Sequence, residues 1–151
     1  FVGNYTQFSN IVENLKNGKI EEFAKGLQDE ILSSLSYFDT EKDEKYYKIF
    51  LIGIFIILGN DYIRLSERES GYGRADLVLE PKNKINPAYI FEFKAVNNED
   101  ELENYAKAGF EQIKEKEYDV ELRNRGTGRI VCVGLAFYRK KIKMKYEIME
   151  K

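Results

Sequence analysis

Two prolines bracket a short, mostly polar loop, and this arrangement limits the fold more than any other feature of the sequence. Pro81 and Pro87 are the only prolines of the chain. Segments with alternating apolar side chains lie on both sides of the loop, at 74–80 and 88–95. Because proline lacks a backbone donor, it belongs at strand ends and turns. The pattern therefore predicts an antiparallel hairpin centred near Lys84.

The hairpin brings three charged residues to one place. If its register is symmetric about the loop, Asp76 faces Glu92, and the alternation of side chains puts Lys94 on the same face. Two carboxylates that face each other between apolar neighbours repel, and a divalent cation that prefers oxygen ligands removes this conflict. The residues thus predict a site for Mg²⁺ or Mn²⁺ at Asp76 and Glu92. Lys94 would orient the attacking water or stabilise charge on a phosphate.

Apolar periodicity predicts the remaining elements of the chain. Helices are expected within 1–40, at 43–58 and at 98–116, and further strands at 62–66, 129–138 and 140–149. A strand-helix-strand order of this kind indicates an α/β fold with a mixed β-sheet flanked by helices. A polar stretch at 39–43 suggests a boundary between an α-helical N-terminal lead-in, 1–40, and a catalytic-type domain, 41–151.

Two further polar residues are candidates for the site. Glu44 opens the helix expected at 43–58 and shares a face with apolar Leu51, so its carboxylate needs a partner. It is a third candidate metal ligand, and a helix start that complements the dipole is the alternative. Gln112 lies at the edge of the inner face of the later helix. It is a candidate for hydrogen bonding a phosphate or the attacking water, and a solvated helix residue is the alternative.

The helix expected at 98–116 has an inner face and a start signal of its own. Asn98 and Glu101 resemble a capping box. The residues expected to face inward are Leu102, Tyr105, Ala106, Gly109 and Ile113.

Composition excludes several classes of chemistry. The chain contains no histidine, which removes Ser-His and Cys-His catalysis and histidine-ligated zinc. Its one cysteine, Cys132, lies in an apolar run and is expected to be a buried structural thiol. The net charge of −2 means that a surface for nucleic acid would have to be local. No apolar run reaches membrane-spanning length, so a soluble, reducing, cytoplasmic setting without a membrane partner is expected.

The ordered set of motifs is similar to that of the PD-(D/E)XK nuclease superfamily. The set is an acidic residue, Asp76, then the triplet 92–94 at a strand end, with Glu44 on a helix before them and Gln112 on a helix after them. The sequence around these motifs resembles one bacterial and archaeal branch of the superfamily, in which such a domain follows a predicted AAA-type ATPase domain. The segments that carry this resemblance are 67–77, 90–94, 111–113 and Tyr118.

The resemblance spans roughly residues 43–138 and implies a restriction-endonuclease-like fold. It implies metal-dependent cleavage of phosphodiester bonds, with DNA as the expected substrate. Asp76 and Glu92 would be metal ligands and Lys94 the catalytic lysine. It also implies an ATPase domain before this one, which fits a chain that starts at Phe1 without a methionine.

The chain departs from the family pattern at two positions. Ala75 stands where the name of the superfamily has a proline. Tyr47 stands where the branch often has a histidine, so any role of that histidine does not transfer to this chain.

Other interpretations of the same residues remain open at this point. Asp76 and Glu92 would form a structural ion network with Arg74 and Lys94 in a catalytically silent nucleic-acid-binding domain of the same fold. A regulatory or oligomerising module for an attached ATPase is a second alternative. A nucleotide hydrolase is disfavoured, because the glycines Gly71 and Gly73 are not followed by the Lys-Ser/Thr of a phosphate loop. The sequence leaves the oligomeric state open.

Overall fold

The computed structural model describes residues 3–31, 53, 58–65, 75–139 and 141–150. Its α-helices are α1 (Gly3–Lys16), α2 (Ile20–Gly26), α4 (Leu102–Glu115) and α5 (Val120–Asn124). Short helical turns follow α2 at η1 (Leu27–Ile31), precede the sheet at η3 (Leu58–Asn60) and precede α4 at η5 (Glu99–Glu101). The strands are β1 (Tyr62–Arg64), β2 (Leu77–Pro81), β3 (Ala88–Ala95), β4 (Arg129–Tyr138) and β5 (Lys141–Glu150).

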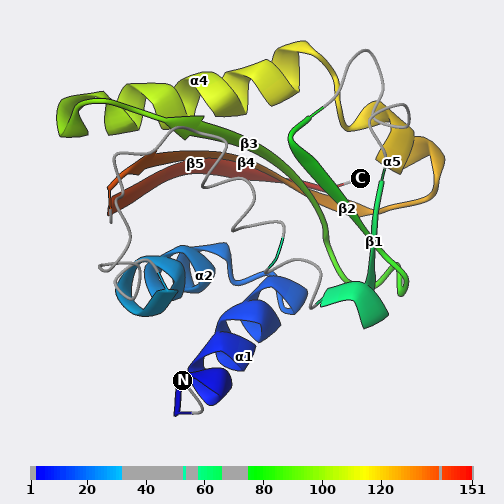
Figure 1. Ribbon diagram of the computed structural model, residues 1–151. Coiled ribbons are helices and arrows are strands. Elements are labelled where there is room, and N and C mark those ends of the chain that lie inside the picture. The colour runs from blue at the N-terminus through cyan, green and yellow to red at the C-terminus, as the bar shows by residue number, and fades with distance from the viewer. Residues whose placement is uncertain (1–2, 32–52, 54–57, 66–74, 140, 151) are drawn as a thin grey trace.

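The five strands form one mixed sheet in the order β1-β2-β3-β4-β5. β3 and β4 run parallel, and the other neighbours run antiparallel. Helix α4 covers one face of the sheet, and α1 and α2 cover the other (Figure 1). In the chain, α4 lies between β3 and β4 and forms part of the crossover that parallel neighbours require. The expected α/β fold, a mixed sheet flanked by helices, is confirmed.

The register of the hairpin β2–β3 is the symmetric one expected from the two prolines. Leu77 pairs with Phe91 and Val78 with Ile90, so each step forward on β2 is matched by one step back on β3. The strand β2 nevertheless differs in its bounds from the expected 74–80. It includes Pro81 because Pro81 still pairs with Tyr62 of β1 on its other side.

Alternation along β3 divides the core into two faces. Tyr89, Phe91 and Phe93 are fully buried on the face covered by α1 and α2. The ring of Phe23 in α2 contacts Phe91, with ring centroids 6.4 Å apart. The hydroxyl of Tyr89 donates to the backbone carbonyl of Leu15 at the end of α1. The described helices within 1–31 therefore share a core with the sheet, and the proposed division at residues 40 and 41 stays a prediction.

Helix α4 differs from its expected form at the start and on its buried face. Residues 99–101 form a turn of 3₁₀-helix, and the Asn98 side chain caps it by accepting from the backbone N–H of Asp100 at 3.0 Å. The expected inward orientation of Tyr105 is wrong, because this side chain is 42% exposed. Phe110 is buried in its place, since the residues facing the sheet continue from Ala106 to Phe110 and Ile113.

One helix of the structure was not expected, and one expected helix lies mostly outside the described residues. The short helix α5 was not expected, because five residues are too few to show a period. The helix expected at 43–58 lies almost wholly outside the described residues, apart from helical Gly53 and the turn η3 at its expected end.

The position of α4 depends on two glycines. A Cβ atom added to Gly134 of β4 would lie 2.0 Å from the carbonyl oxygen of Ala106 in α4. A Cβ added to Gly109 of α4 would lie 3.3 Å from Cβ of Glu92. Gly134 also pairs with Glu92 across β3 and β4. The helix backbone therefore rests directly on the sheet backbone beside Glu92.

A side chain at residue 134 should displace α4. We expect Gly134→Ala to lower the free energy of unfolding by about 3 kcal/mol, because the clash is with backbone that cannot rotate away. Urea denaturation measures this loss. Gly128→Ala is the matched control, since a Cβ there meets nothing within 4 Å. Equal stability of the two variants would show that the helix does not need this close contact.

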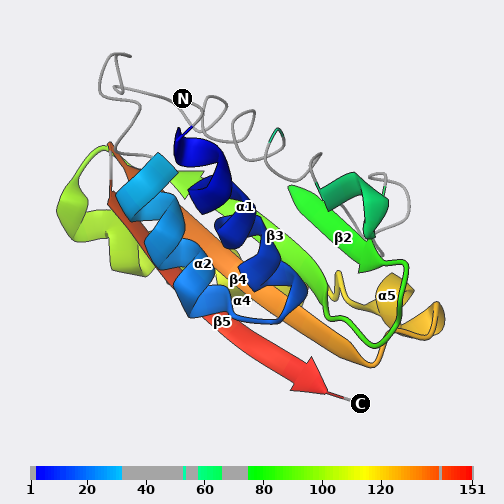
Figure 2. The same ribbon diagram turned by 90° about the horizontal axis from the view of Figure 1, so that it is seen from below.

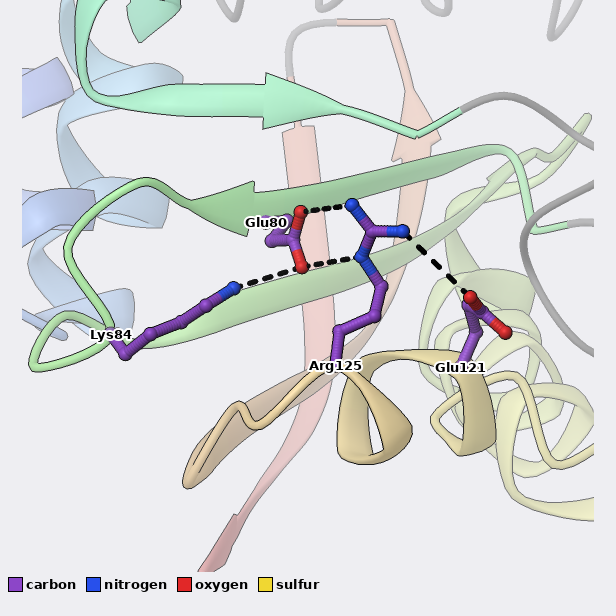
Figure 3. A network of polar contacts seen from close by, with 4 residues as sticks. All are labelled: Glu80, Lys84, Glu121 and Arg125. Carbon is purple, nitrogen blue, oxygen red and sulfur yellow. Dashed lines mark hydrogen bonds and ion pairs between the residues drawn. The ribbon is translucent and has the colours of Figure 1, made fainter.

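An ion network around one buried carboxylate ties α5 to the hairpin (Figure 3). Glu80 of β2 is 2% exposed and accepts from Nε and Nη2 of Arg125, at 2.7 and 3.0 Å, and from Nζ of Lys84 at 2.9 Å. Arg125 also lies 3.9 Å from the carboxylate of Glu121 in α5. The bonds from Arg125 hold the pKa of Glu80 below its ordinary value. Glu80 is therefore ionised and compensated in the folded protein.

Arg125→Ala should destabilise the fold by about 2 kcal/mol at neutral pH, because the buried carboxylate of Glu80 keeps only its bond to Lys84. A group whose pKa is lowered on folding stabilises the protein above its unfolded pKa. The deficit of Arg125→Ala should therefore shrink as the pH falls below the ordinary carboxyl pKa of 4.5. Urea denaturation at several pH values measures it. Arg125→Ala in a Glu80→Gln background should cost clearly less, and an equal cost would exclude the ion pair as its cause.

Candidate metal centre

Asp76 and Glu92 lie side by side where β2 begins. The backbone N–H of Asp76 donates to Oε1 of Glu92 at 3.1 Å, and the backbone N–H of Phe93 donates to Oδ2 of Asp76 at 2.8 Å. Each carboxylate is thus held by the opposite strand of the hairpin. Glu92 is buried, with 3% of its surface exposed, and Asp76 is half-buried. The facing arrangement follows from the register of the β2–β3 pairs.

Burial and a like charge together change the proton affinity of Glu92. Burial is the larger cause and the negative charge of Asp76 the second, and they raise the pKa of Glu92 to about 8. The N–H of Asp76 and the ammonium of Lys94 act in the opposite direction with smaller effect. At neutral pH the Glu92 carboxyl therefore favours its protonated form. A cation at the same place would remove both the repulsion and the need for that proton.

The donor set fits a hard divalent cation. Mg²⁺ binds through one or two protein carboxylates and completes its shell with waters and substrate oxygens. Asp76 and Glu92 supply such a pair. Within the described part of the chain, no group of three or more Asp, Glu, His or Cys side chains gathers as a fuller metal cage. Glu44, the third candidate ligand, lies outside the described residues, and its role stays a prediction.

Lys94 contacts a neutral partner on α4. Its Nζ donates to Oε1 of Gln112 at 3.3 Å, and Nε2 of Gln112 donates to the hydroxyl of Tyr118 at 3.4 Å. Tyr118 is buried close to the end of α4. Gln112 follows Gly109 by about one helical turn. The close contact of α4 with the sheet at Gly109 therefore places the Gln112 side chain next to Lys94. The structure thus brings Asp76, Glu92, Lys94 and Gln112 together on the α4 face.

The alternative ion network would join Asp76 and Glu92 to Arg74 and Lys94. Arg74 lies outside the described residues. The bond that the structure shows for Lys94 goes to the amide of Gln112 rather than to a carboxylate.

Cys132 is fully buried on the same face of the sheet, and burial raises the pKa of its thiol to about 12. The expected structural thiol is confirmed. Gly109 and Gly134, which set the helix position, were not singled out as functional from the sequence. A glycine inside an apolar strand such as β4 is the signal that could have revealed Gly134, because it often marks a close backbone approach.

Comparison with known protein families gives a match over most of the chain. The family model of the PD-(D/E)XK nuclease superfamily matches residues 42–147. The chain belongs to the PD-(D/E)XK nuclease superfamily. The five candidate residues Glu44, Asp76, Glu92, Lys94 and Gln112 all lie in the matched segment, and the mixed sheet is consistent with a restriction-endonuclease-like fold. A comparison with curated proteins found no match.

The described helices of this PD-(D/E)XK protein include none with the length and apolar character needed to cross a bilayer.

Glu92 should make the stability of the metal-free protein dependent on pH. Its folded pKa of about 8 lies above the ordinary value of 4.5, so the folded state binds the proton more tightly. Stability should therefore fall as the pH rises between these values. Thermal unfolding followed by circular dichroism in EDTA, from pH 6 to 8.5, measures the slope. Glu92→Gln, which cannot ionise, should show a flatter dependence, and identical slopes would contradict the assignment.

Proposed function

We propose that this domain is a metal-dependent nuclease that hydrolyses phosphodiester bonds, with DNA as the expected substrate. The observation that carries the proposal is the facing pair of Asp76 and buried Glu92, with Lys94 on the same face. Membership of a nuclease superfamily supports it. A buried carboxylate with a raised pKa, such as Glu92, is costly to maintain for the fold alone, and a cation offsets that cost.

Each residue has a distinct role in the proposed reaction. Asp76 and Glu92 hold Mg²⁺ or Mn²⁺, and Glu44 is proposed as a further ligand. A bound ion of this kind lowers the pKa of a water and neutralises charge on the phosphate. The ammonium of Lys94 places the attacking water in line with the phosphorus or compensates charge on the phosphate.

Gln112 is proposed to keep Lys94 in position. Its Oε1 accepts from Nζ of Lys94, and its Nε2 is occupied by the hydroxyl of Tyr118. The bond to Tyr118 fixes which end of the amide faces Lys94. Because Gln112 is neutral, Lys94 keeps its full positive charge for the substrate.

Cleavage of linear, circular and single-stranded DNA and of RNA, with Mg²⁺ or Mn²⁺, tests the proposal. Asp76→Ala, Glu92→Gln and Lys94→Ala should each reduce the rate by about 100-fold or more, because each removes a charge that acts on the transition state. Gln112→Ala should cost less, since Lys94 remains. Lys107→Ala, at an exposed position of α4, is the matched control and should retain activity.

Two outcomes would reject parts of this proposal. Equal activity of the wild type and the three site variants would exclude this site. If the protein binds DNA without needing the metal and does not cleave it, the catalytically silent alternative is favoured. Isothermal titration of Mg²⁺ into Glu44→Ala, compared with the wild type, tests the third ligand directly.

We also propose an attachment to an ATPase and a cytoplasmic location. The sequence of residues 67–77 and 90–94 resembles that of the superfamily branch in which this domain follows an AAA-type ATPase domain. In that arrangement residues 1–40 connect the two domains. The coding sequence upstream of Phe1 should then encode a phosphate loop of the ATPase type.

A further inference from the structure

Strand β5 forms one edge of the sheet. It is the last strand in the order and pairs with β4 over its whole length, from Lys141 to Glu150. In the view from below, β5 is the outer border of the sheet (Figure 2). A long edge strand offers a row of backbone donors and acceptors to another strand.

The direction of the backbone groups on this edge follows from two hydrogen bonds. The N–H of Val96 donates to the carbonyl of Phe137, so the backbone groups of Phe137 point toward β3. Ile142 pairs with Phe137 across β4 and β5, so its own backbone groups point away from β4. The N–H of Ile142 indeed donates outward, to Oε1 of Gln28, at 2.8 Å. The same outward direction recurs at every second residue, at Met144, Tyr146 and Ile148.

From 142 to 148 the side chains of β5 differ between the two faces of the sheet: those on one face are apolar or aromatic, and those on the other are charged. Met144 and Tyr146 are half-buried against the core beside α1 and α2, and Ile148 on that face is 42% exposed. Lys145 and Glu147 are exposed on the α4 face. Nζ of Lys145 lies 5.7 Å from the ring centroid of Phe110, and the carboxylate of Glu147 lies 2.7 Å from Nζ of Lys114. Between 144 and 148 the edge therefore carries one charge of each sign next to an exposed apolar residue.

We propose that β5 pairs antiparallel with β5 of a second copy of this chain, with the two Tyr146 residues facing each other. In this register Lys145 of each copy lies opposite Glu147 of the other, on both sides of the two-fold axis. Met144 lies opposite Ile148 and covers its exposed side chain. Opposite charges that face each other across strands stabilise the pair.

Other registers with the same backbone directions are disfavoured by charge. Centring the pair on Lys145 or on Glu147 sets like charges directly opposite each other at the axis, which is destabilising, although the Lys145 register also sets Lys143 opposite Glu147. Centring it on Met144 sets Lys143 opposite Lys145 twice. Centring it on Ile148 sets Glu147 opposite Met149, so no opposite charges face each other within 146–150. The distribution of charge along β5 thus selects one register, centred on Tyr146.

The pairing leaves one contact at the edge in place and keeps the two faces of the sheet. The ladder from Met144 to Ile148 stops before Ile142, so the bond between Ile142 and Gln28 remains. Antiparallel neighbours keep their faces, so α4 of both copies lies on the same side of one continuous sheet. The pairing uses no residue of the proposed metal site, and its test does not depend on nuclease activity.

Sedimentation equilibrium of the full 151-residue chain over a range of concentrations tests the proposal. The wild type should dimerise, and the single variants Lys145→Glu and Glu147→Lys should each weaken dimerisation at least tenfold, because each creates two like-charge pairs. An equimolar mixture of the two variants should form a heterodimer, in which all facing charges are opposite. The double variant Lys145→Glu/Glu147→Lys should dimerise again. Lys116→Glu, the same charge change at an exposed residue away from the edge, is the matched control.

A second pair of variants tests the backbone pairing. Ile148→Pro removes an N–H that points away from β4, so the fold should persist while the dimer is weakened. Ile148→Thr keeps that N–H and should weaken the dimer less. Circular dichroism verifies the folding of every variant. A wild type that sediments as a monomer at every concentration overturns the proposal, and so does a dimer that both single charge variants leave intact.

Discussion

The backbone of α4 lies directly on the backbone of the sheet at Gly134, and the site depends on this contact. A single methyl group at residue 134 would lie 2.0 Å from a carbonyl oxygen of the helix. The same approach places Gly109 against Glu92, which buries that carboxylate. It also carries Gln112 to within hydrogen-bonding distance of Lys94. A helix even slightly farther from the sheet would leave Glu92 hydrated and Lys94 without its partner.

Two buried glutamates on the hairpin show how their surroundings decide their chemistry. Glu80 and Glu92 are 2% and 3% exposed. Arg125 and Lys84 surround Glu80, so its pKa is lowered and its charge is satisfied within the fold. Burial, and after it the negative charge of Asp76, raises the pKa of Glu92 instead. Glu80 therefore acts as a structural ion, whereas Glu92 favours its protonated form, and the proposed metal would take the place of that proton.

The edge strand β5 also has polar groups, the backbone N–H and C=O groups that point away from β4. The protein caps one outward N–H on this edge with Gln28. Beyond that point Met144, Tyr146 and Ile148 present their backbone groups outward, and a second copy of the strand would satisfy them. Glu80 finds its partners within the fold, whereas a metal ion and a second copy of the chain are the partners proposed for Glu92 and for the outward groups of β5.

The sequence alone determined the hairpin register, the bounds of β3 and β4, and the facing of Asp76 and Glu92. These features depend on local signals: two prolines, strict alternation and the period of a strand. What only the tertiary structure decided was how the layers meet. The burial of Phe110 instead of Tyr105, the contact at Gly134 and the bond of Arg125 to Glu80 join residues far apart in the chain. Local periodicity carries no information on such distances, because the close packing of one backbone on another sets them.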